Sequence, residues 1–111
     1  MERLRQRADF LAAASGVKVP AAGFVLQANR RRGNDGVRVG FTVSKKVGNA
    51  VERNRVRRRL REIVRLAPDA AMQPGHDYVL IGRRAALDLS FARMADEFSR
   101  ALTRVHAKAA R

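Results

Sequence analysis

Hydrophobic side chains recur at helical spacing in the middle of the chain. They follow the i, i+4, i+7, i+8, i+11 pattern of one helix face at Val56, Leu60, Ile63, Val64 and Ala67. Asn49 precedes this stripe as a favourable N-cap, and Glu52 stands three residues later, as in a capping box. Pro68 cannot continue a helix. The pattern therefore predicts an amphipathic helix from Asn49 to Arg65, with its apolar stripe packed on a sheet.

Two strand-like segments precede this helix. Phe24–Asn29 is largely apolar, and Val37–Ser44 alternates between apolar and polar residues. Between them, Arg30–Gly36 contains two glycines and an Asn-Asp pair, which predicts a hairpin loop. The alternation in the second strand predicts one buried face and one small, polar, basic face. The polar face comprises Arg38, Gly40, Thr42 and Ser44.

The remaining segments complete the predicted fold. Asp77–Gly82 is a continuous apolar run, typical of a strand buried on both faces, so the helix before it would form a βαβ crossover. Asp9–Ser15 favours a short helix, and Ser90 can cap a final helix. The final helix has an apolar stripe of Phe91, Met94, Ala95, Phe98, Leu102 and Val105. We expect an α+β fold, a two-layer α-β sandwich in the order α-β-β-α-β-α, with one possible extra short strand.

Length and composition suit a single domain. The chain has 111 residues, of which 46% are hydrophobic, enough for one core over 1–111. We expect residues 1–7 and 107–111 to be flexible, and Lys18–Ala22 to be a connection. No apolar run approaches the length of a bilayer span, and no signal peptide is visible. The absence of cysteine excludes disulfides and thiolate metal sites and fits a cytoplasmic protein.

The charge of the chain indicates the class of partner that it binds. The formal net charge is +14 and the pI is near 11.8, which predicts a nucleic acid or an anionic membrane surface as partner. The central helix carries seven arginines and two glutamates. Arg53, Arg57, Arg61 and Arg65 form one ridge, where like charges repel until a polyanion binds. Arginine also offers a planar fork suited to phosphate.

Blander interpretations of this helix remain open. A run of charges is often a solvated helix face. A calmodulin-target or membrane-surface helix would need a large exposed apolar face, which the core requires here. The polar face of the second strand is either solvated or a trough for single-stranded nucleic acid, with Lys45 and Lys46 supplying charge at its end. Phe10 is either a stacking partner for a base or an ordinary core phenylalanine.

Catalytic motifs are missing from the sequence. The acidic residues are scattered, with no pair that suggests a two-metal site. His76 and His106 have no metal-ligand partners at useful spacing, and His76 lies in a turn-like stretch that predicts a surface position. There is no P-loop and no dinucleotide-binding glycine motif. We therefore expect no catalytic residue and no metal site in the protein itself.

The segment Arg38–Arg58 closely resembles the signature of the bacterial ribonuclease P protein subunit. The hallmark of that family is a Lys-x-x-Gly-Asn-Ala-Val-x-Arg-Asn-Arg run that enters a basic helix, and Lys45–Arg55 matches it. Weaker matches extend the resemblance over nearly the whole chain, at Asp9 and Phe10, Phe24–Leu26, Asp77–Val79 and Arg83.

The resemblance implies a ribosomal-protein-like sandwich and a role in ribonuclease P, the ribonucleoprotein endonuclease that removes the 5′ leader of precursor tRNA. The implied partners are the catalytic RNA subunit and precursor tRNA. Magnesium ions, bound mainly by the RNA subunit, would support hydrolysis, and the protein would not be catalytic on its own. The implied RNA-subunit-binding residues are Arg53, Asn54, Arg55, Arg57, Arg58, Arg61 and Arg65. The implied leader-binding residues are Phe10, Arg38, Thr42, Ser44, Lys45 and Lys46.

The chain departs from the family pattern at two positions. Many members carry an aromatic residue where this chain has Ala14, one helical turn after Phe10. Many also carry an aromatic residue near the position of Gln27 in the first strand. Base stacking is therefore expected to be weaker here and phosphate contact more important. Two other classes are alternatives: a structural RNA-binding module such as a ribosomal protein, and a duplex-DNA binder that uses the helix in the major groove. Beyond Asn54 the helix offers mostly arginine rather than base-reading side chains, so we expect no DNA partner and no membrane.

Overall fold

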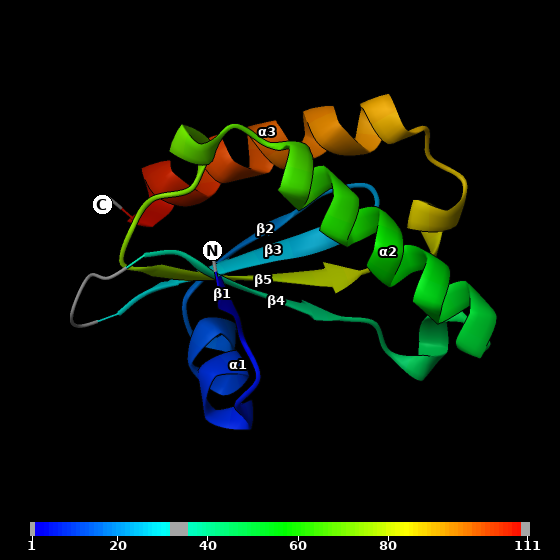
Figure 1. The fold of residues 1–111 in the computed structure, drawn as a ribbon, viewed down its shortest axis with the longest axis horizontal. Helices are drawn as coiled ribbons and strands as arrows, with labels where there is room; N and C mark the ends of the chain where they lie inside the picture. The colour runs from blue at the N-terminus through cyan, green and yellow to red at the C-terminus, as the bar shows by residue number, and fades with distance from the viewer. Residues whose placement is uncertain (1, 32–35, 110–111) are drawn as a thin grey trace.

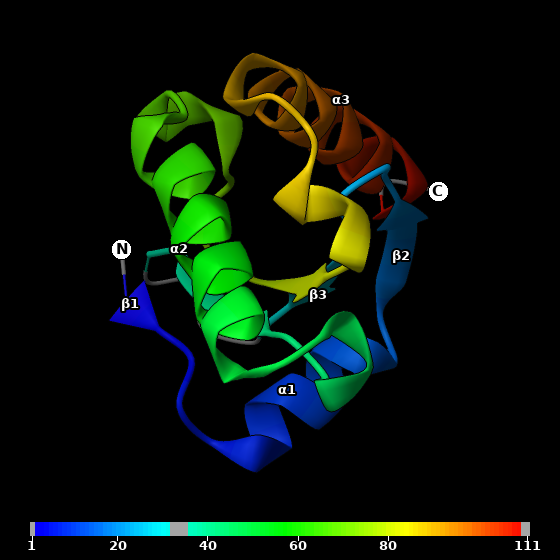
Figure 2. The same cartoon turned by 90° about the vertical axis from the view of Figure 1, so that its right-hand side faces the viewer.

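The computed structural model describes residues 2–31 and 36–109, which form a five-stranded sheet with helices on both faces. The strands are β1 (Glu2–Arg3), β2 (Val17–Pro20), β3 (Phe24–Arg30), β4 (Arg38–Thr42) and β5 (His76–Gly82). The helices are α1 (Arg7–Ala14), α2 (Ala50–Leu66) and α3 (Phe91–Ala109), with 3-10 turns at Lys45–Val47, Asp69–Ala71 and Arg84–Leu87. Helices α2 and α3 cover one face of the sheet and α1 lies on the other (Figures 1 and 2). The predicted α+β sandwich is thereby confirmed.

Strand β5 lies at the centre of the sheet, whose order is β1-β4-β5-β3-β2. It pairs antiparallel with β3 and parallel with β4, so β4, α2 and β5 form the predicted βαβ crossover. The predicted hairpin between Phe24–Asn29 and Val37–Ser44 is wrong, because β5 separates those two strands. A strand that is apolar on both faces is best satisfied where both edges are paired and both faces are covered. Residues 32–35 of the predicted hairpin loop lie outside the described residues.

The described residues near both ends of the chain, 2–4 and 107–109, contact the rest of the fold, and residues 1, 110 and 111 lie outside the described residues. Glu2–Arg3 pairs with β4 instead of forming a loose arm, and Leu4 is buried. The segment predicted as a connection contains β2, the extra strand, which pairs with β3 at the sheet edge. Pro20 is tolerated there because an edge strand can lack one N–H donor. At the other end α3 stays helical to Ala109, and Lys108 Nζ donates to the carbonyl of Lys18 at 3.2 Å.

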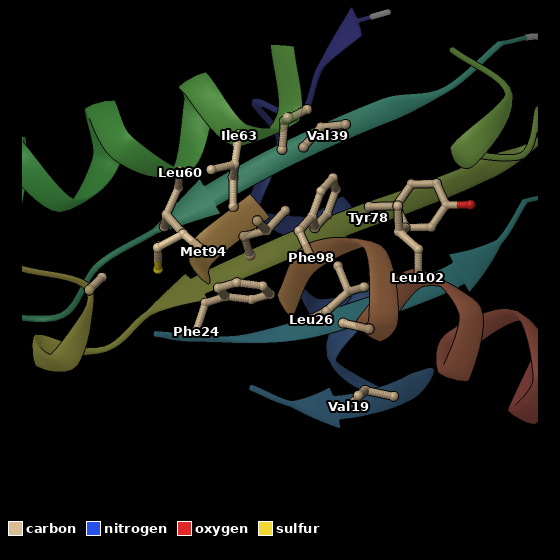
Figure 3. Close-up of a cluster of buried hydrophobic side chains, with 14 of the residues drawn as sticks. Val19, Phe24, Leu26, Val39, Leu60, Ile63, Tyr78, Met94, Phe98 and Leu102 are labelled. Carbon is tan, nitrogen blue, oxygen red and sulfur yellow. The ribbon is translucent and has the colours of Figure 1, made fainter. Parts of the chain in front are cut away.

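The main core lies between the sheet and helices α2 and α3 (Figure 3). The capping box forms as predicted: Asn49 Oδ1 accepts from Glu52 N at 2.9 Å, and Glu52 Oε1 accepts from Asn49 N at 3.0 Å. Ser90 Oγ accepts from Arg93 N at 3.1 Å and begins α3. The stripes of the two helices meet the sheet through Val56, Leu60, Ile63, Val64, Met94, Phe98, Leu102 and Val105, which are all buried.

A smaller cluster holds α1 on the opposite face. It consists of Leu4, Ala13 and Val79, with Phe10 and Ile81 packed against it. The ring of Phe10 lies directly on Gly40, where an added Cβ would be 2.6 Å from Phe10 Cε1. Phe10 is therefore half-buried, so its exposure lies between that of an ordinary core phenylalanine and that of an open stacking partner for a base.

His76 is buried rather than exposed, contrary to the sequence prediction. It begins the central strand, its Nδ1 donates to the carbonyl of Pro74 at 3.2 Å, and its ring stacks on Tyr78. The hydroxyl of Tyr78 lies 2.7 Å from His106 Nε2 and accepts from Gln73 N. Burial raises the pKa of Tyr78; burial first, and then the nearby His76, lower the pKa of His106. These rings therefore belong to the packing at the end of β5 and α3.

Candidate nucleic-acid interface

The outer face of α2 carries arginines that have no carboxylate partner within residues 2–31 and 36–109. Arg55, Arg58 and Arg61 are exposed, because the apolar stripe turns the opposite side of the helix toward the sheet. Among the described residues, none accepts a hydrogen bond or forms an ion pair with any of these three side chains or with Arg53. Such an array repels itself in the free protein and favours a polyanionic ligand.

Other predicted residues of this face are tied to neighbours along the helix. Arg57 Nη1 donates to Asn54 Oδ1 at 3.0 Å, on the exposed surface. Arg65 pairs with Glu62, with Nε 3.2 Å from Oε2. This hydrogen-bonded pair raises the pKa of Arg65 and lowers the pKa of Glu62. These contacts are surface contacts, which contribute little to stability, so the side chains stay available to phosphate.

Arg59 differs from the arginines around it. Its side chain is half-buried, whereas Arg58 beside it is exposed. Its Nη2 donates to the carbonyl of Leu89 in the segment before α3, and its buried Nε has no partner among the described residues. Arg59 is thus a contact within the fold.

The basic turn Ser44–Gly48 connects the sheet to α2. Ser44, Lys45 and Lys46 are exposed there, as the sequence predicts. Arg84, which follows β5 in the chain, holds this turn in place. Its Nη1 donates to the carbonyl of Val47 at 2.6 Å, and its Nη2 is 3.1 Å from Glu52 Oε2.

The backbone N–H of Asn49, and after it Arg84, lower the pKa of Glu52. The turn and the first turn of α2 are therefore held as one unit. Sequence reasoning missed Arg84, because its only local signal is the Arg83-Arg84 pair far along the chain.

A cleft of about 470 Å³ separates α1 from the sheet. Strand register aligns Gln27 with Val79, and Ile81 with Thr42, so that neighbouring strands supply these four residues to its floor. Two predicted leader-binding residues, Phe10 and Thr42, line the cleft. The full lining is Arg5, Arg7, Phe10, Leu11, Ala14, Gln27, Phe41, Thr42, Val79 and Ile81.

The charge of the cleft comes from a source that the sequence did not predict. Arg7 begins α1 and Arg5 lies just before it, both in a segment predicted to be flexible, and both line the cleft. Because β1 pairs with β4, this segment is held against the sheet and brings both guanidinium groups to the cleft.

Arg38, a predicted leader-binding residue, is engaged inside the fold. Its Nε and Nη2 donate to the carboxylate of Asp77 at 2.8 and 2.6 Å, and Nη2 lies 3.3 Å from Asp9 Oδ1. Arg31 Nη1 donates to the same Asp77 carboxylate at 2.5 Å. Burial alone would raise the pKa of Asp77, which is 2% exposed, but the hydrogen bonds from Arg38 and Arg31 outweigh it and lower that pKa. The hydrogen bonds from Arg38 to Asp77, followed by the charges of Asp77 and Asp9, raise the pKa of Arg38.

Comparison with known proteins places this geometry in a family. The family model described as Ribonuclease P matches residues 1–106. The chain belongs to the ribonuclease P protein family. It is 50% identical over 109 residues to the ribonuclease P protein component of Gluconacetobacter diazotrophicus, which covers 97% of this chain and 94% of that protein. It is 49% identical to the corresponding protein of Ruegeria pomeroyi, with 94% of this chain and 86% of that protein covered.

Solved ribonuclease P proteins have the same fold. The structure from Thermotoga maritima superposes with a TM-score of 0.79 at 31% identity, covering 95% of this chain and 98% of that one. Across residues 2–31 and 36–109, no helix is long and apolar enough to cross a membrane. The same residues contain no cluster of three or more His, Asp or Glu side chains that would hold a metal ion.

Proposed function

We propose that this chain is the accessory protein of ribonuclease P, the endoribonuclease that removes the 5′ leader of precursor tRNA. In this proposal the chain binds the catalytic RNA subunit and the leader, while the RNA carries out the hydrolysis with magnesium ions that it holds itself. The observation that carries the proposal is the pair of basic surfaces, one on α2 and one at the cleft, in a member of the ribonuclease P protein family. The proposed compartment is the cytoplasm.

The RNA subunit is assigned to α2. The exposed guanidinium groups of Arg55, Arg58 and Arg61 lie along one helix and suit a row of phosphates. Neutralising these charges also removes their mutual repulsion. The proposed contact residues are those implied by the family signature, namely Arg53, Asn54, Arg55, Arg57, Arg58, Arg61 and Arg65.

The leader is assigned to the cleft and the basic turn. Phe10 and Thr42 line the cleft, and Ser44, Lys45 and Lys46 continue its basic surface beyond the end of β4. Single-stranded nucleic acid suits such a site, because apolar side chains receive bases and cations at the rim receive phosphates. Arg38 stays in the predicted set, although its guanidinium is already bonded to Asp77 and Asp9.

Reconstitution with a bacterial ribonuclease P RNA tests the proposal. The protein alone should leave precursor tRNA intact. With the RNA subunit it should raise cleavage at low magnesium, and a variant with Arg55, Arg58 and Arg61 changed to Ala should require a higher protein concentration for the same effect. The matched control is Arg104→Ala, on the exposed surface of α3. Cleavage by the protein without RNA, or stable association with ribosomal subunits at high salt instead of with this RNA, would contradict the proposal.

A further inference from the structure

Arg84 is not among the proposed RNA-binding residues, but it contacts the segment that joins the two RNA-binding surfaces. It lies in the 3-10 turn after β5, 32 residues beyond Glu52 in the chain. Its Nη1 donates to the carbonyl of Val47 at 2.6 Å, and its Nη2 lies 3.1 Å from Glu52 Oε2. One guanidinium therefore holds both a backbone carbonyl of the basic turn and a carboxylate in the first turn of α2.

Gly48 lies between these groups and has no side chain to separate them. An added Cβ on Gly48 would lie 2.9 Å from Arg84 Nη1 and even closer to Glu52 Oε1. The same Oε1 accepts from the backbone N–H of Asn49 at 3.0 Å. Gly48, Asn49, Glu52 and Arg84 thus form one closely packed unit, which we call the Arg84 clamp.

The clamp determines how the basic turn leaves the fold. The side chain of Val47 is buried in the core, and its carbonyl is held by Arg84, so this end of the turn is fixed on both sides. Lys45 and Lys46, just before it, are exposed. Binding a ligand restricts the freedom of long side chains, and a fixed backbone reduces that cost because fewer arrangements must be given up.

We infer that Arg84 is a positioning residue for the leader, which fixes the direction in which the basic turn presents Lys45 and Lys46. The side chain of Arg84 is 62% exposed, so its ion pair with Glu52 contributes little to the stability of the whole fold. Its effect is confined to the turn. Opening the clamp therefore weakens leader binding without removing a phosphate contact. This inference rests on the proposed leader-binding function.

The affinity of the reconstituted holoenzyme for precursor and mature tRNA tests the inference. Arg84→Ala should weaken precursor tRNA binding by roughly tenfold, the cost of ordering one or two long side chains. Mature tRNA affinity and the urea midpoint of the protein should stay near wild type. The slope of log K against log salt concentration should also stay unchanged, because no phosphate contact is lost. The matched control is Arg100→Ala, at an exposed arginine of α3 that lies 3.1 Å from the carboxylate of Asp96, and it should bind both tRNAs as wild type does.

Three further variants separate position from charge. Arg84→Lys keeps the charge but lacks the planar fork that holds two acceptors, so it should remain defective. Glu52→Gln keeps an oxygen for the N–H of Asn49 but places an NH2 group opposite Arg84, and Gly48→Ala forces a Cβ into the clamp. Both should reproduce the defect of Arg84→Ala. Combining Glu52→Gln with Arg84→Ala should add little further loss, because the two groups act as one unit.

Several results would overturn the inference. A salt slope reduced by roughly 0.7–0.9 in Arg84→Ala would show that Arg84 binds a phosphate itself. Wild-type affinity in Arg84→Lys would show that charge alone is required. Equal losses for precursor and mature tRNA, or a urea midpoint well below wild type, would assign Arg84 to general structure. If changing Lys45 and Lys46 to Ala leaves precursor affinity unchanged, the leader-binding function of the turn is itself wrong.

Discussion

Two groups of arginines in this protein differ in what surrounds them. Arg31 and Arg38 share the carboxylate of Asp77, and their side chains are only 16% and 25% exposed. Arg55, Arg58 and Arg61 project from α2 into solvent, without a carboxylate partner in the described parts of the chain. Each arginine of either group adds one positive charge to the net charge of +14. Composition alone therefore does not tell which arginines bind RNA.

The two groups of arginines differ in burial and in the partners of their guanidinium groups. A guanidinium that is bonded to a buried carboxylate has its hydrogen-bonding directions occupied, and moving it toward a ligand would leave a buried charge unpaired. A guanidinium with water as its only partner releases counterions and loses like-charge repulsion when it meets phosphate. We infer that the first group stabilises the fold and that the second binds the RNA subunit.

Asp77→Asn should have the largest effect on stability. It leaves Arg31 and Arg38 without their shared counter-charge, and breaking a buried ion pair on one side costs about 3 kcal/mol or more. Urea unfolding at pH 7 measures the loss. Asp88→Asn, at an exposed aspartate, is the control and should change stability by less than about 0.5 kcal/mol. A loss for Asp77→Asn as small as the control's would show that this cluster does not stabilise the fold.

The pH dependence of that loss follows from the lowered pKa of Asp77. Because the folded pKa lies below the ordinary value of 3.8, the carboxylate contributes fully above that value. Its contribution disappears as the pH falls through the folded pKa, where the carboxylate becomes protonated. The stability difference between wild type and Asp77→Asn should therefore stay constant from neutral pH down to the ordinary pKa and shrink below it. A difference that vanishes already near neutral pH would point to another cause.

Arg58 and Arg59 are neighbours on one helix, so substituting each of them compares an exposed arginine with one that is bonded within the fold. The expected changes in stability are smaller than for Asp77→Asn. Arg59→Ala removes the hydrogen bond to the carbonyl of Leu89 and should lower the free energy of unfolding by about 1 kcal/mol. Arg58→Ala removes an exposed charge from a repulsive array and should leave stability within about 0.5 kcal/mol. Affinity for the RNA subunit should fall only for Arg58→Ala. If both variants lose affinity equally, the division between fold-directed and RNA-directed arginines on α2 is wrong.

The features that the sequence predicted correctly depend on residues that are close together along the chain. The apolar stripe and the capping box of α2 are repeated local patterns, so the helix and its basic face follow from them directly. The position of β5 between β3 and β4 depends on pairing between distant segments, which no local pattern contains. The partners of Arg38 and Arg84 were missed for the same reason: Asp77 and Glu52 lie 39 and 32 residues away along the chain. The charge of Arg5 and Arg7 was visible, but its place at the cleft required the pairing of β1 with β4.

The salt dependence of affinity for the RNA subunit alone tests the division of arginines most directly. Each lost phosphate contact should reduce the slope of log K against log salt concentration by roughly 0.7–0.9. Arg57→Ala and Arg61→Ala should each show that reduction, whereas Arg38→Ala, measured under conditions where it is folded, should keep the wild-type slope. An unchanged slope for both α2 variants, or an equal reduction for Arg38→Ala, would contradict the assignment of α2 as the RNA-binding surface.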